Sequence, residues 1–203
     1  MIIGVLAVQG DFAEHIALLK ELGIGVSEVR LPHDLEDIDA LIIPGGESTT
    51  QRKLLDLYLL TEPITSLVAK GTPLWGTCAG MIIMARELTD KHPEPLGLMD
   101  ITVTRNAYGR QAESFEVDVD VPDLGVEPYH AIFIRSPAVA KIGQDVEVLC
   151  RLVDGTPVAL RQGSMLATAF HPELTSDSRF HRYFISMVAS KNGAEGQDNA
   201  SKT

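Results

Sequence analysis

The sequence predicts an α/β protein: a doubly wound, mostly parallel sheet flanked by helices, with additional antiparallel strands in the C-terminal half. Two observations predict it. Up to about residue 95, continuous apolar runs alternate with segments of helical periodicity, which is typical of parallel strands buried on both faces. Beyond that point, short strand-like runs follow one another without a long helix until residue 177.

The elements of the N-terminal half follow from apolar runs and helix signals. A buried strand is expected at 2–8, and a helix is expected to begin after Asp11, a candidate N-cap, and to stop at Gly23. The remaining elements are expected to be strands at 26–31 and 39–46, a helix entered through Ser48 and Thr49, a helix at 61–70, and a strand–turn–helix at 73–85.

The C-terminal half is expected to be built from short strands joined by turns. Asp-Gly at 154–155 and Gln-Gly at 162–163 are hairpin signals. The strands are expected at 101–106, 113–121, 131–137, 147–153, 156–163 and 164–170, and a helix at 177–190 closes the fold. We expect a single domain over 1–190 and a disordered tail over 191–203, because the tail has no apolar periodicity.

Charge and composition exclude several classes of function. The chain has 203 residues, with 28 acidic against 17 basic residues and a formal net charge of −11, so the basic face that nucleic-acid binding requires is absent. No apolar run reaches the length of a membrane span, and the N-terminus lacks the features of a signal peptide. Two cysteines do not make a disulfide framework. A cytoplasmic protein without a membrane partner is therefore expected.

The segment Gly-Thr-Cys-Ala-Gly at 76–80 has the form of a nucleophile elbow, with Cys78 at its point between a strand and a helix. Such a turn strains the central residue and directs its side chain to the carboxyl edge of the sheet. The helix beginning near Ala79 presents free N–H groups that favour a thiolate and stabilise an oxyanion. The pentapeptide alone is equally compatible with an ordinary buried cysteine.

A thiolate nucleophile needs a base, and His171 is the candidate. It ends a strand in the segment AFHPEL, and Glu173 follows two residues later. In an extended chain these two side chains point to one face, so the carboxylate can fix the tautomer of the imidazole. Cys78, His171 and Glu173 thus form a candidate catalytic triad.

The other histidines and the second cysteine have simpler interpretations. His15 and His181 lie in amphipathic helices and are expected to be partly exposed. His33 and His92 lie in polar loops and are expected to be solvated, while the role of His130 is left open. Cys150 lies in an alternating strand sequence and is expected to pack in the core.

Together, these residues give the chain a resemblance to a known family. With its elbow cysteine and the HPE segment it resembles the class I (triad) glutamine amidotransferases, and more specifically the glutaminase subunits of pyridoxal 5′-phosphate synthase. The resemblance covers the whole chain except its tail. The motifs that carry it are AVQGDFAEH at 7–15, LIIPGGESTT at 41–50, WGTCAGMI at 75–82, RNAYGRQ at 105–111 and FIRSP at 133–137.

The resemblance implies hydrolysis of L-glutamine, with no metal or organic cofactor, and delivery of ammonia to a (β/α)₈ synthase subunit. It implies that the backbone of Gly46 and Ala79 holds the oxyanion. An arginine suits the α-carboxylate of an amino acid. The residues implied to bind glutamine are Gly46, Glu47, Ser48, Arg105, Ile134 and Arg135.

Three alternatives remain open at this stage. A triad glutaminase of another nitrogen pathway would differ only in its partner. A stand-alone cysteine peptidase or γ-glutamyl hydrolase of the same fold would turn over without a partner. A non-catalytic binding subunit would keep the elbow as a scaffold.

Overall fold

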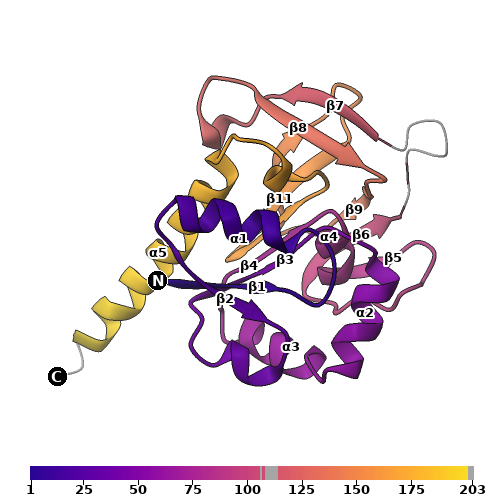
Figure 1. Ribbon diagram of the computed structural model, residues 1–203. Coiled ribbons are helices and arrows are strands. Elements are labelled where there is room, and N and C mark those ends of the chain that lie inside the picture. The colour runs from indigo at the N-terminus through magenta and orange to yellow at the C-terminus, as the bar shows by residue number, and fades with distance from the viewer. Residues whose placement is uncertain (106, 108–113, 201–203) are drawn as a thin grey trace.

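The computed structural model describes residues 1–105, 107 and 114–200, the side chains of 192–200 excepted (Figure 1). Within these residues the largest sheet has seven strands in the order β10-β11-β12-β4-β3-β1-β2. Its strands are β1 (Ile2–Leu6), β2 (Gly25–Val29), β3 (Ala40–Ile43), β4 (Leu74–Thr77), β10 (Glu147–Arg151), β11 (Pro157–Gln162) and β12 (Met165–Thr168).

The centre of this sheet is parallel. Strands β12, β4, β3, β1 and β2 pair in parallel, in that order. Every residue of β3 and β4 is buried, as expected for strands covered on both faces. Because parallel strands end at one edge of the sheet, the loops that follow β1, β3, β4 and β12 meet there.

Helices cover both faces of the parallel strands. In Figure 1, α1 lies on one side of the sheet, and α2 and α3 lie on the other. The helix after Cys78 is only six residues long and is followed directly by a strand that was not predicted, β5. The helices are α1 (Phe12–Glu21), α2 (Ser48–Leu57), α3 (Thr61–Ala69), α4 (Ala79–Met84) and α5 (Arg179–Ala200), with short 3₁₀ turns η1 (Pro32–Leu35), η2 (Pro122–Leu124) and η3 (Pro172–Leu174).

Antiparallel strands are added in the C-terminal half. β10, β11 and β12 pair antiparallel through the two predicted hairpin turns. Two smaller sheets stand apart from the main one. They consist of β5 (Ala85–Leu88), β6 (Met99–Thr104) and β9 (Ala138–Ile142), and of β7 (Ser114–Val119) with β8 (Tyr129–Ile134). The fold class is confirmed; β9 is an element that the sequence interpretation missed.

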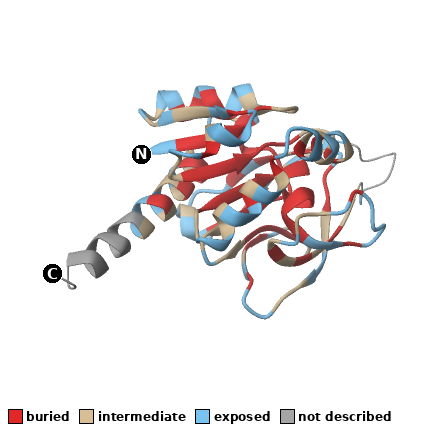
Figure 2. Cartoon of the chain, turned by 90° about the horizontal axis from the view of Figure 1, so that it is seen from below, coloured by how far each residue is buried: buried red, intermediate tan, exposed pale blue. Residues whose placement is uncertain are grey.

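The buried residues are concentrated in the central sheet and the helix faces against it (Figure 2). The largest fully buried side chain is Trp75 of β4, which contacts the rings of Phe180 and Phe184 from α5. The helix α5 continues to Ala200, and the proposed domain limit at residue 190 stays a prediction. None of the described helices is long and apolar enough to cross a membrane.

Candidate active site

Cys78 lies at the end of β4 in a strained backbone conformation. Its φ is 46° and its ψ is −100°, and it is the N-cap residue of α4. A positive φ is costly for a residue with a Cβ, and such strain is concentrated at functional sites. The backbone N–H of Cys78 donates to the carbonyl of Thr168 at the end of β12, at 2.8 Å, which fixes the elbow to the neighbouring strand.

The two glycines of the elbow are required by close backbone approach. A Cβ on Gly76 would lie 2.6 Å from the backbone of Gly80, and a Cβ on Gly80 would lie 2.0 Å from the carbonyl oxygen of Ile43. Side chains at these positions would therefore force α4 away from β4 and β3. This is the physical reason for the Gly-x-Cys-x-Gly spacing.

His171 and Glu173 follow β12 and form a buried pair. The Nδ1 atom of His171 lies 2.7 Å from Oε1 of Glu173, and both side chains are almost fully buried. The conformation differs from the extended one that we predicted, because Pro172 begins a 3₁₀ turn, η3, with His171 as its N-cap residue. Proline is favoured at the first position of a helical turn, and the two side chains meet across that turn.

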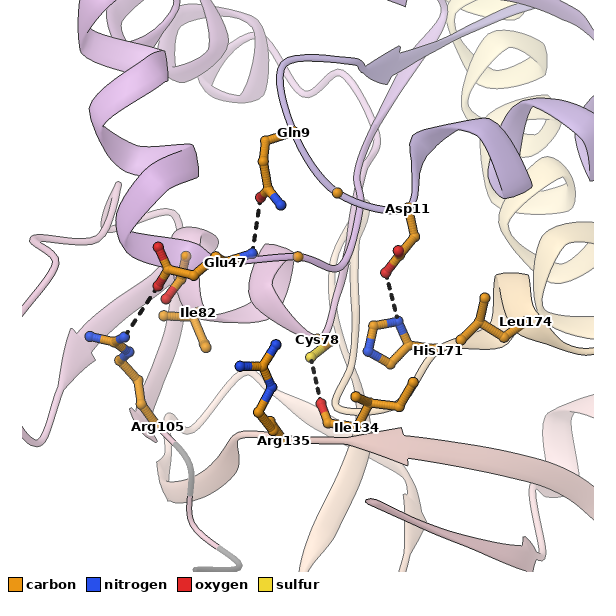
Figure 3. Close-up of a pocket in the computed structure, with 13 residues that line it drawn as sticks. Gln9, Asp11, Glu47, Cys78, Ile82, Arg105, Ile134, Arg135, His171 and Leu174 are labelled. Atoms are coloured by element: carbon orange, nitrogen blue, oxygen red, sulfur yellow. Dashed lines mark hydrogen bonds and ion pairs between the residues drawn. The ribbon is translucent and has the colours of Figure 1, made fainter. Parts of the chain in front are cut away.

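A second carboxylate, that of Asp11, also faces His171. Its Oδ2 atom lies 3.3 Å from Nδ1 (Figure 3). Burial by itself lowers the pKa of His171, but its interactions with Asp11, Cys78 and Glu173 outweigh burial and raise the pKa. Burial raises the pKa of Glu173, and its hydrogen bond to His171 opposes that change. The close grouping of three potential metal ligands, Asp11, His171 and Glu173, follows from these hydrogen bonds.

A cavity of about 340 Å³ opens in front of Cys78 and His171. Its size lies in the range of small-molecule sites, about 300–1,000 Å³. Figure 3 shows the arginine side chains of its wall directed into this space. The predicted glutamine-binding residues all line it, namely Gly46, Glu47, Ser48, Arg105, Ile134 and Arg135.

Glu47 and Arg105 lie together on one wall of the cavity. Glu47 is the N-cap of α2, which begins at Ser48 as predicted, and its carboxylate accepts from the backbone N–H groups of Thr49 and Thr50. Burial acts to raise the pKa of Glu47, but these hydrogen bonds and those of the threonine side chains lower it to about 2. The Arg105 guanidinium lies 3.7 Å from this ionised carboxylate.

The opposite wall is formed by the end of β8. Cys78 Sγ lies 3.6 Å from the carbonyl oxygen of Ile134, a contact drawn in Figure 3. Arg135 follows with a φ of 45°, a second strained position at the cavity. The backbone N–H of His171 donates to the carbonyl of Ile132, so β8 is held directly against the triad.

The glycine turn after β3 is fixed by glutamine side chains that the sequence interpretation did not single out. The Gln51 amide nitrogen donates to the carbonyls of Gln9 and Pro44 at 3.2 and 3.1 Å. The Gln9 side chain accepts from the backbone N–H of Glu47 at 2.9 Å. A Cβ on Gly45 would lie 2.3 Å from the His171 ring, so this turn is pressed against the triad.

Several residues that line the cavity were missed: Gln9, Gly10 and Asp11 after β1, together with Ile82 and Leu174. Asp11 occupies the N-cap position of α1 but makes no side-chain capping hydrogen bond, and its carboxylate faces His171 instead. The predicted order of parallel strands could have indicated Gln9, Gly10 and Asp11, because they follow a strand that ends at the edge of the sheet where Cys78 lies.

The expectation for His15 and His181 was wrong. Both are fully buried, because their rings contact each other and Trp75 of the central sheet. His33 and His92 are exposed, as predicted, and Cys150 is buried. His130 lies exposed between the carboxylates of Glu116 and Asp118.

The two residues expected to hold the oxyanion lie at the edge of the sheet beside Cys78. Ala79 is buried at the start of α4, directly after Cys78, and Gly46 lines the cavity. Their roles remain proposals. Of the motif RNAYGRQ, only Arg105 and Ala107 lie within the described residues.

A cysteine at a nucleophile elbow, paired with a His–carboxylate dyad at the carboxyl edge of a parallel sheet, defines the class of cysteine-nucleophile hydrolases and amidotransferases. The chain belongs to one family of that class, the SNO glutamine amidotransferase family, which matches residues 5–190.

Relatives of similar length support this assignment. A protein of Herpetosiphon aurantiacus is 55% identical over 190 residues, which are 92% of this chain and 100% of the relative. A protein of Dehalococcoides mccartyi is 54% identical over 190 residues, covering 93% of this chain and 97% of the relative. Both are named pyridoxal 5′-phosphate synthase subunit PdxT.

Solved structures agree with the fold. A crystal structure described as a glutamine amidotransferase superposes with a TM-score of 0.87 at 48% identity, over 93% of this chain and 100% of its own. A putative GMP synthase protein of Thermoplasma acidophilum superposes with a TM-score of 0.69 at 18% identity, over 97% of this chain and 98% of its own. The second similarity shows the fold alone.

Proposed function

We propose that this protein is the glutaminase subunit of a pyridoxal 5′-phosphate synthase, which hydrolyses L-glutamine to L-glutamate and ammonia. The observation that supports this proposal most directly is that Cys78, His171 and Glu173 lie together beside one cavity of a glutamine amidotransferase fold. The names of the relatives support the particular pathway over other glutaminases of the same fold.

In the proposed reaction the Cys78 thiolate attacks the side-chain carboxamide carbon of glutamine. The carbonyl π electrons move to oxygen, and the backbone N–H groups of Ala79 and Gly46 hold the oxyanion. When the intermediate collapses, the C–N bond breaks and His171 protonates the departing ammonia, leaving a γ-glutamyl thioester. His171 then takes a proton from water, which attacks the thioester and releases glutamate and the thiolate. Each oxyanion donor contributes about 10²–10³ to the rate.

Glu173 and the cavity wall supply orientation. Glu173 accepts from Nδ1–H of His171, which leaves Nε2 for proton transfer. We assign recognition of the glutamine backbone to Gly46, Glu47, Ser48, Arg105, Ile134 and Arg135. Glu47 stays ionised because its pKa is about 2, so it can attract the α-ammonium group, while the arginines can attract the α-carboxylate.

A partner that accepts ammonia is part of the proposal, because free ammonia is mostly protonated at neutral pH and is then not a nucleophile. We propose that this partner is a (β/α)₈ synthase subunit. Its docking would complete the oxyanion turn, so that glutamine is not consumed without an acceptor. In the free chain the Gly45 carbonyl already accepts from the backbone N–H of Asp11 at 3.1 Å, so any rearrangement of the turn must break that bond.

The test is glutamate formation from glutamine by the purified chain, with and without the synthase subunit from the same source. We expect a strong rise with the subunit, and a loss of at least about 10³-fold in Cys78→Ala. Cys150→Ala is the matched control and should retain activity. Equal activity without the subunit would contradict the docking proposal, and activity in Cys78→Ala would contradict the triad.

A further inference from the structure

A pair of buried histidines lies directly behind the triad. Nδ1 of His15, on α1, is 3.0 Å from Nε2 of His181, on α5. Both residues are fully buried, and both rings contact the indole of Trp75 in edge-to-face geometry. The proposed reaction makes no use of either residue, although uncompensated burial of two imidazoles is costly.

The other ring nitrogen of His15 faces the triad carboxylate. His15 Nε2 lies 3.4 Å from Oε2 of Glu173 and 3.3 Å from the hydroxyl oxygen of Thr77, the residue before Cys78. Glu173 Oε1 is occupied by His171, but Oε2 is buried and forms no hydrogen bond to a described residue. A proton on His15 Nε2 would therefore be the polar hydrogen of the histidine pair that lies beside this oxygen.

Hydrogen-bond accounting selects one tautomer for the pair. If His15 carried its proton on Nδ1, it would donate to His181 Nε2. Its own Nε2 lone pair would then face the Glu173 carboxylate, and the proton on His181 Nδ1 would be buried without a partner among the described residues. A buried donor without an acceptor is destabilising.

The opposite arrangement has neither fault. His181 Nε2–H donates to His15 Nδ1, and His15 Nε2–H donates to the hydroxyl oxygen of Thr77 and lies 3.4 Å from Oε2 of Glu173. Among the described residues, His181 Nδ1 is then the one ring nitrogen of the two histidines without a hydrogen-bond partner, and it carries a lone pair instead of a proton. Burial, followed by the charges of His181 and His171, lowers the pKa of His15, so the ring is neutral as this arrangement requires. Burial likewise lowers the pKa of His181 to about 4.

We propose that His15 is a positioning residue of the triad, which keeps the positive end of its Nε2–H bond beside Oε2 of Glu173 while His181 holds it in that tautomer. The inference rests on the proposed glutaminase function. An N–H group this close to Oε2 stabilises the ionised form of Glu173 electrostatically, whereas burial opposes ionisation. Ionised Glu173 in turn stabilises the imidazolium form of His171, and that cation favours the Cys78 thiolate.

Two substitutions of His15 separate this role from simple core packing. In His15→Gln the side-chain amide nitrogen can take the place of Nε2, so the donor to Glu173 is retained. In His15→Asn the shorter amide can take the place of Nδ1, so the contact with His181 is retained and the donor to Glu173 is lost. Both variants put a polar amide into the same buried position.

The experiment measures kcat and KM for glutamine in the complex with the synthase subunit, together with the pH dependence of Cys78 alkylation by iodoacetamide in a Cys150→Ala background. For His15→Asn we expect kcat to fall about 10–100-fold, as is typical for the loss of an outer-shell partner. KM should not change, because His15 does not line the cavity. The midpoint of alkylation should move to higher pH. His15→Gln should stay near wild type in both measurements.

Equal losses of kcat in the Asn and Gln variants, or an unchanged alkylation midpoint in His15→Asn, would overturn the inference. If His15→Asn does not fold, His15→Phe provides the test. It keeps a buried ring and removes the Nε2–H that faces Glu173, so it should move the midpoint in the same direction, and an unchanged midpoint would again overturn the inference. Alkylation does not depend on turnover, so a wild type without glutaminase activity would refute the proposed function and leave the His15 test intact.

Discussion

The two cysteines of the chain occupy equally buried but different environments. Cys78 is 4% exposed and Cys150 is 3% exposed. Cys78 lies at a strained turn where four strand ends meet, within reach of His171. Cys150 lies within β10, paired with Ala159 of β11, and the charge of Asp120 adds to the effect of burial in raising the pKa of its thiol.

The difference shows that burial does not decide the chemistry of a thiol. Burial raises the pKa of Cys150 to about 11, which keeps it protonated and inert at neutral pH. At Cys78 the backbone is strained and a buried His171–Glu173 pair borders the same cavity, as the proposed reaction requires. Three changes would break or sharpen this contrast.

The largest effect is expected from Glu173→Gln. The amide cannot stabilise the imidazolium of His171 and can stabilise the wrong tautomer, so kcat should fall about 10²–10⁴-fold. The matched control is Glu116→Gln, which alters an exposed His–Glu pair at His130. Glutaminase assays in the complex should show no change for Glu116→Gln. A similar loss of kcat in both variants would show that the buried His171–Glu173 pair has no special role in the reaction.

A smaller effect is expected at Cys150 in alkaline solution. Its pKa is raised from 9.0 to about 11, so the folded state retains the proton that the unfolded state loses. This contribution to stability is complete below pH 9 and is lost as the pH rises through about 11. Urea unfolding between pH 9 and 11 should therefore show a steeper decline in the free energy of unfolding for wild type than for Cys150→Ala. If the free energy of unfolding declined equally in wild type and Cys150→Ala, the pKa of the Cys150 thiol would not be raised by folding.

The smallest effect is expected from comparing glycine with alanine at the two sites. At Cys78, with φ at 46°, glycine relieves strain of about 1–3 kcal/mol and adds chain flexibility costing about 0.5–1 kcal/mol. Cys78→Gly should therefore be more stable than Cys78→Ala. At Cys150, which lies in β10 and is not among the residues with a positive φ, the order should be reversed. Denaturant midpoints measure both differences, and the same order at both sites would mean that the elbow stores no strain.

The sequence alone determined the elements that depend on local patterns. Apolar runs identified β1, β3 and β4, because a strand buried on both faces has few polar positions. The glycine spacing identified Cys78, because steric crowding at a sharp turn is a property of adjacent residues. The HPE segment indicated that His171 and Glu173 lie close together, because they are near neighbours in the chain. The conformation between them was predicted incorrectly, since it is a 3₁₀ turn and not extended.

Only the tertiary structure decided which distant residues surround Cys78, His171 and Glu173. Asp11 faces His171 because β1 and β12 end at the same edge of the sheet. His15 and His181, 166 residues apart, meet because α1 and α5 pack on one face of it. Helical periodicity gives the direction of a side chain relative to its own helix, but burial and partners depend on which elements the chain brings alongside. The turn that carries Cys78 could therefore be predicted from the sequence, whereas the histidines behind it could be found only in the folded structure.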